Sequence, residues 1–88
     1  MKGERVSDEP GEDGIYPMLL PGQYGKRGGT WFGRTPGNHL ANLARHQIEE
    51  HADGTITVQP SILVSTLDKD GNRVELWHGW LRAGEWVT

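Results

Sequence analysis

The chain has 88 residues, of which 34% are hydrophobic and 24% are charged. A chain of this length forms one small domain, and its 13 glycines and 5 prolines favour strands and turns over a helical bundle. Because cysteine is absent, the sequence excludes disulfides, cysteine-ligated zinc and thiol catalysis. It has neither an apolar run of membrane-spanning length nor a signal-peptide pattern, so we expect no membrane insertion and no Sec export.

The acidity of the chain is confined to its first residues. The formal net charge is −3, and residues 1–14 alone hold two basic and five acidic residues, whereas the rest of the chain is balanced. The segment has one aliphatic residue besides Met1, so it cannot bury enough surface to offset the entropy of ordering. We predict a disordered acidic tail over 1–14 and a single small β domain over 15–88. The scattered basic residues of that domain do not predict nucleic-acid binding.

The first half of the domain predicts few regular elements. Residues 15–20 form a short apolar run, interrupted by a proline, that is typical of an edge strand or an extended arm. Residues 23–29 are a glycine-rich connection, and residues 30–35 are a short aromatic strand. Residues 38–45 place apolar side chains at spacings of three and four, which indicates one short helical turn at most.

The second half predicts hairpins. Strands are expected at 46–51, 55–66, 73–81 and 86–87, with turns between them at 52–54, 68–72 and 82–85. The strand at 55–66 alternates almost strictly between apolar and polar residues, and Pro60 marks a bulge, a bend or an edge within it. Five or six short strands joined mainly by hairpins predict a mainly β fold, an antiparallel meander that forms a compact barrel or sandwich.

Tryptophans supply the candidate binding residues. Trp77 and Trp80 differ in parity within one strand, so one of the two faces away from the core unless the strand is irregular. Trp80 and Trp86 flank the turn at 82–85 and could stack across that hairpin. The most economical role of each ring is to fill the core of a small domain, but an exposed ring would serve a sugar, a base or a protein partner. We select Trp77, Trp80, Arg82 and Trp86 as candidate contacts.

No pattern of catalysis or of metal binding is present. His46 and His51 are five apart in one predicted strand, so they point to opposite faces and do not predict a metal site. Ser61 and Ser65 lack a nucleophile elbow, and residues 25–30 have the wrong order for a phosphate-binding loop. We therefore predict a protein that is not an enzyme, with no catalytic residue, no metal and no cofactor.

Two blocks resemble known sequences. Residues 51–62, HADGTITVQPSI, and residues 77–86, WHGWLRAGEW, are similar to blocks of uncharacterised small β proteins of actinobacteria and their phages, in which they read HxDGTITVxPSI and WHGxLxxGxW. The resemblance implies a compact β domain of phage or prophage origin and implies no activity. Some of those proteins carry cysteines near the start of the domain, where this chain has none, so a metal role there would not extend to this chain.

Three hypotheses follow. The first is a non-enzymatic, phage-encoded protein-binding module that docks on a host or defence protein in the bacterial cytoplasm. The second is a virion structural protein, a decoration or tail-associated subunit that self-associates and extends residues 1–22 as an arm onto a neighbour. The third and weaker one is a small-ligand binder for a sugar or a nucleotide, which would need a pocket that combines an aromatic side chain with arginine or histidine.

Overall fold

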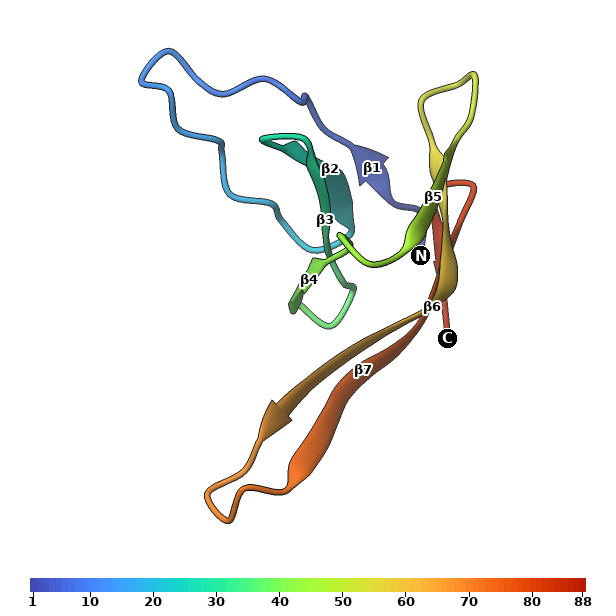
Figure 1. The fold of residues 1–88 in the computed structure, drawn as a ribbon. Coiled ribbons are helices and arrows are strands. Elements are labelled where there is room, and N and C mark those ends of the chain that lie inside the picture. Colours follow the sequence, from blue (N-terminus) through green and yellow to red (C-terminus); the bar gives the residue numbers. More distant parts are fainter.

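The fold consists of two four-stranded β sheets without a helix. The computed structural model describes residues 1–88, and its two sheets face each other with the core between them (Figure 1). The first sheet runs in the order β1-β2-β3-β4, formed by Glu4–Arg5, Gln23–Arg27, Thr30–Arg34 and Leu40–Asn42. The second runs in the order β5-β6-β7-β8, formed by Gln47–Glu50, Ile56–Leu67, Arg73–Arg82 and Glu85–Val87.

The second sheet confirms the predicted antiparallel meander. β6 pairs with β5 on one side and with β7 on the other, and β7 also pairs with β8. The alternation in β6 buries Ile56, Val58 and Ile62, each with at most 1% of its surface exposed. The predicted mainly β class is therefore correct, but the two sheets do not close into a barrel.

The first sheet differs from the prediction in two places. Residues 23–27, expected to be a connection, form β2, and Leu40–Asn42 form β4 where a helical turn was expected. Asn38 has a positive φ of 67°, which is incompatible with a helix that begins there. β4 instead pairs with β3 and turns Ala41 toward the core, since three residues in an extended conformation alternate between faces.

Residues 1–14 are not a disordered tail. β1 pairs in parallel with β2, and the amide of Val6 donates to the carbonyl of Tyr24 at 2.9 Å. The amide of Gly3 also donates to the carbonyl of Gly84 at 2.7 Å, so the segment contacts both sheets. The composition argument failed because backbone hydrogen bonds, rather than buried apolar surface, attach this segment.

Residues 15–21 have no regular secondary structure and lie against the first sheet of their own chain. The Nε of Arg34 donates to the carbonyl of Leu19 at 2.6 Å, and Arg27 donates to the carbonyl of Pro17 at 3.1 Å. Leu19 is buried, whereas Met18 and Leu20 are exposed. The segment is therefore not the edge strand that the sequence predicted, and it lies against its own chain rather than projecting as an extended arm.

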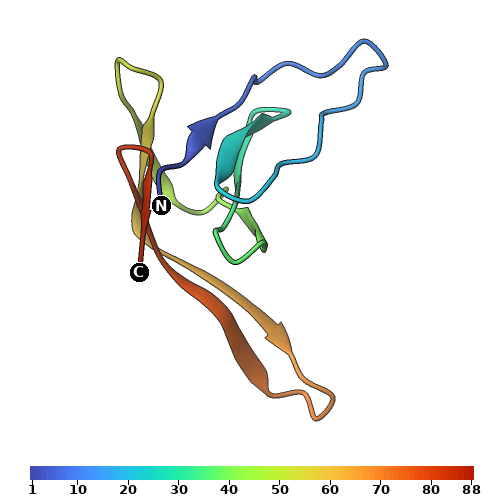
Figure 2. The same ribbon diagram turned by 180° about the vertical axis from the view of Figure 1, so that it is seen from behind.

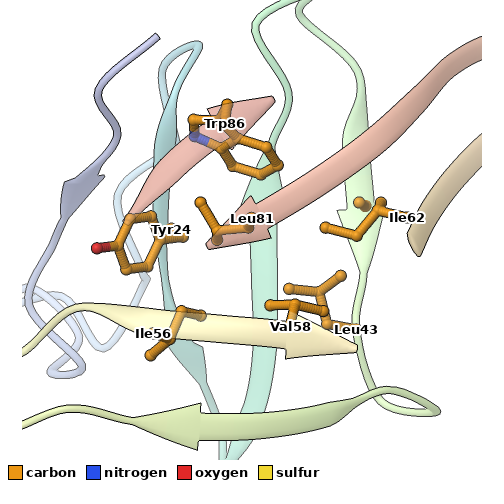
Figure 3. Close-up of a cluster of buried hydrophobic side chains, with 8 residues drawn as sticks. Tyr24, Leu43, Ile56, Val58, Ile62, Leu81 and Trp86 are labelled. Carbon is orange, nitrogen blue, oxygen red and sulfur yellow. The ribbon is translucent and has the colours of Figure 1, made fainter. Parts of the chain in front are cut away.

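Side chains from both sheets meet in one core. Tyr24, Leu43 and Trp86 are buried with Ile56, Val58, Ile62 and Leu81, and they lie together between the strands (Figure 3). Burial raises the pKa of the Tyr24 hydroxyl, because the ionised form would lose its hydration.

Candidate functional site

Trp86 belongs to the core rather than to a contact surface. It is 2% exposed, and its Nε1–H donates to the carbonyl of Gly22 at 2.9 Å. Trp77 packs against it edge to face, with ring centroids 5.6 Å apart. These two predicted contact residues thus join the sheets, and Trp86 leaves the candidate set because it offers almost no surface to a partner.

Trp80 and Trp86 do not stack across the last hairpin. Trp80 lies opposite Val87, and Trp86 lies opposite Leu81. The turn at Ala83 and Gly84 places Arg82 opposite Glu85, and this register puts the two tryptophans in neighbouring cross-strand pairs rather than in the same pair. Neighbouring positions on a strand point to opposite faces, which sends Trp86 inward and Trp80 outward.

Three side chains form a row on the outer face of β7. His78, Trp80 and Arg82 are two residues apart, so they share the face that is opposite the core. The guanidinium carbon of Arg82 lies 5.1 Å from the centroid of the Trp80 ring, and the His78 ring centroid lies 5.6 Å from it. The indole is thereby held between two neighbours, which limits its rotamers.

A β-bulge in β6 faces Trp80. Val58 pairs with Leu81 and Ile62 pairs with Gly79, so three residues of β6, 59–61, lie opposite the single residue Trp80. Bulges of this kind interrupt the ladder and redirect side chains, and they are frequent beside functional sites. The sequence pointed to this feature, because Pro60 lacks the N–H that a regular ladder needs.

The row and the bulge border a shallow groove. Its volume is about 520 Å³, and its lining includes the side chains of Gln47, Thr57, Gln59, Ser61, Trp80 and Arg82. Gln47 and Gln59 are opposite each other on β5 and β6. The structure therefore gathers two of the predicted contact residues, Trp80 and Arg82, with two glutamines that the sequence analysis did not select. Their position beside each other depends on the pairing of β5 with β6, which no local sequence pattern indicates.

The polar groups of the groove fall into two sets. The Thr57 hydroxyl is already engaged, because it accepts a hydrogen bond from the Ala83 amide at 2.9 Å and lies 2.7 Å from His51 Nε2. The Ser61 hydroxyl lies 2.9 Å from His78 Nε2. The exposed side chains of Gln47, Gln59 and Arg82, in contrast, take part in none of the hydrogen bonds within the chain, so they are available to a ligand.

A second surface is the hairpin of β6 and β7, which projects from the body (Figure 1, and from behind in Figure 2). β5 pairs only with residues 56–59 and β8 only with residues 80–82, so residues 62–67 and 73–79 form a ribbon of two strands with both edges free. Its exposed apolar side chains are those of Leu63, Leu67, Val74 and Leu76, which are 52%, 61%, 40% and 41% exposed. We call residues 62–79 the projecting hairpin.

A second irregularity of the ladder lies at the exposed residue Leu76. Val64 pairs with Trp77 and Ser65 pairs with Glu75, so Leu76 is an extra residue of β7 without a partner. Up to this point the side chains of Val64 and Trp77 pack against the core, and beyond it the hairpin has no such support. The bulge therefore marks the end of the part of β7 that the core holds in place.

The histidines do not form a metal-binding cluster, although His78 Nδ1 lies 3.9 Å from Glu75 Oε1. No three residues of the metal-ligating types form a group that could hold an ion. His46 Nε2 lies 3.2 Å from the carbonyl of Ser61, and His51 contacts Thr57. The structure contains no helix with the length and hydrophobicity needed to cross a membrane.

Comparisons with known proteins add no identity. The chain matches no protein family, no curated protein and no solved structure. The resemblance to proteins of actinobacteria and their phages therefore stays an expectation.

Proposed function

We propose that the chain is a non-enzymatic protein-binding module that docks through the projecting hairpin. The observation that carries the proposal is the coincidence of exposed apolar side chains with two free strand edges on the same ribbon. In the phage setting that the sequence resemblance implies, the partner is a host or defence protein in the bacterial cytoplasm.

The low stability expected of an isolated ribbon of two strands favours a partner that pairs with it. A hairpin of two strands is marginally stable by itself in water, because it buries little apolar surface. Free edges also present unpaired N–H and C=O groups that another chain can extend. A partner that adds a strand would satisfy these groups and would cover leucine side chains such as Leu63 and Leu67.

The test compares two leucines of nearly equal exposure. Leu67, on the projecting hairpin, is 61% exposed, and Leu20, in the segment at 15–21 that lies against the first sheet, is 58% exposed. Tagged wild type, Leu67→Ser and Leu20→Ser proteins are used to capture partners from host lysate, and each captured protein is then purified and titrated. We expect Leu67→Ser to lower the affinity for a purified partner by at least about tenfold and Leu20→Ser to leave that affinity unchanged. Equal affinity of all three proteins, or no partner for the wild type, would refute this proposal.

A second candidate function is that of a virion structural subunit. The exposed side chains of Ile15, Met18, Leu20 and Leu40 favour it. Tyr16, Met18, Phe32 and Leu40 also border an apolar groove of about 280 Å³ on the first sheet. This surface would serve contacts between copies of the chain. Light scattering separates the two functions, since a subunit of this kind is an oligomer that Leu20→Ser dissociates, whereas a docking module is a monomer.

A further inference from the structure

The groove beside Trp80 presents chemistry that the projecting hairpin does not use. Its free polar side chains are two amides and one guanidinium, and its aromatic side chain is a partly buried indole. Each amide can donate and accept hydrogen bonds, as can the hydroxyl of Ser61. A ligand that matches this set must itself carry several groups that both donate and accept.

The charges of this face argue against a phosphate-bearing ligand. Arg82 is the only cationic side chain that lines the groove. Two carboxylates belong to the same face, because Glu49 is two residues from Gln47 on β5 and Glu85 lies opposite Arg82 on β8. A nucleotide with two or more phosphate charges would meet one cationic side chain in the groove, with Glu49 nearby and with Glu85 already 3.6 Å from the N-terminal ammonium, whereas phosphate sites collect several cations or backbone amides.

We propose that this groove binds a saccharide. The hydroxyl groups of a sugar both donate and accept, which matches the amides of Gln47 and Gln59 and the donors of Arg82. Its C–H surface packs against the part of the Trp80 indole that Arg82 and His78 leave exposed. The groove volume of about 520 Å³ falls within the usual range for small-molecule sites.

The site is built before a ligand arrives. Gln47, Gln59 and Trp80 project from three neighbouring strands, so the sheet fixes their spacing. His78 and Arg82 flank the indole, and His78 is itself held 2.9 Å from Ser61 Oγ. Preorganised side chains lose less rotamer entropy on binding, which is an advantage for a shallow site.

The experiment is a titration of isotopically labelled protein followed by nuclear magnetic resonance. The probes are neutral trisaccharides of glucose and of N-acetylglucosamine, with ADP as the nucleotide probe. We expect one of the saccharides to shift the Trp80 indole N–H signal and the side-chain amide signals of Gln47 and Gln59, while the buried Trp86 indole signal stays in place. Trp80→Ala and the double variant Gln47→Ala with Gln59→Ala should each weaken the binding by at least about tenfold.

Matched controls keep the result specific to the groove. Arg82→Ala is compared with Arg73→Ala, because both arginines are exposed on β7 and Arg73 lies on the projecting hairpin, away from the groove. Only Arg82→Ala should weaken saccharide binding, and a thermal melt checks that each variant is folded. The proposal is overturned if no saccharide shifts the groove signals, if ADP shifts them instead, or if Arg73→Ala acts like Arg82→Ala. Loss of partner docking by Leu67→Ser is a separate result, so either proposal can fail alone.

Discussion

Arg5 connects the N-terminal strand to both sheets, and its removal gives the sharpest test of the ordered N-terminal segment. Its guanidinium lies 4.6 Å from the centroid of the Trp31 ring in the first sheet. The same group donates to the carbonyl of Gly54 at 2.9 Å and to Glu50 at 3.1 Å in the second sheet. It also donates to Asp8 at 2.8 Å, so one side chain fixes four partners.

The magnitude follows from these contacts. A cation over an aromatic ring contributes about 0.5–1 kcal/mol, and a hydrogen bond from a charged donor about 1.5–3 kcal/mol. The ion pairs with Asp8 and Glu50 are partly exposed, so together they add about 1 kcal/mol at most. Water replaces some of what is lost, and we expect Arg5→Ala to lower the free energy of unfolding by about 2–3 kcal/mol. This loss corresponds to a fall in Tm of roughly 10–20 °C for a chain of this size.

Urea and thermal unfolding, followed by tryptophan fluorescence, measure this loss. Lys2→Ala is the control, because it removes the same charge three residues earlier in the chain. The exposed Lys2 side chain makes no hydrogen bond or ion pair within the chain. Arg5→Lys should fall between the two, since lysine keeps the charge but loses the planar fork. If the free energies of unfolding of Arg5→Ala and Lys2→Ala differ by less than about 0.5 kcal/mol, Arg5 does not hold the segment as described, and a disordered tail over 1–14 becomes the better description.

Three further predictions use the same unfolding assays. Trp86→Ala should cost about 3–5 kcal/mol because it empties the core, whereas Trp80→Ala on the outer face should cost less than about 1.5 kcal/mol; similar losses would contradict the assigned faces. Gly79→Ala should cost about 1–3 kcal/mol, since a Cβ there would collide with the Val87 carbonyl and the Trp77 ring, and an unchanged Tm would disprove that packing. Burial acts to raise the pKa of Asp8, but hydrogen bonds from Arg5 and the Lys26 amide, with the charge of Arg5, outweigh it and hold that pKa below its ordinary 3.8. Asp8 therefore contributes stability above that pH and loses it as the pH falls through the lower folded value, so Asp8→Asn should reduce the acid dependence of Tm; an identical pH profile would count against the pair with Arg5.

The long hairpins were the predictable part of the fold. In β6 the alternation of Ile56, Val58 and Ile62 with polar residues is a local property, because a strand with one buried face needs a period of two. The turn at Asp70 and Gly71 is equally local, since the glycine adopts a positive φ of 82°. Pro60 likewise predicted an irregularity in this strand, and the structure shows it as the bulge opposite Trp80.

The first sheet was not predictable in the same way. β4 has three residues, and the spacing of Leu40 and Leu43 fits a helical turn as well as it fits a strand followed by a buried loop residue. β1 has two residues in an acidic segment, and its attachment depends on partners such as Tyr24 and Gly84 that are distant in the sequence. Hydrogen bonds between such distant groups leave no periodic pattern in a single short stretch of chain.

The sequence by itself determined the β class, the meander of the second half and the opposite directions of Trp77 and Trp80, because each depends on alternation within single strands. Only the tertiary structure decided which face of β7 is buried, because that depends on the first sheet that covers Trp77 and Trp86. It also decided that Gln47 and Gln59 join Trp80 and Arg82 in one groove, since strand pairing and the bulge at residues 59–61 set the distances between these strands.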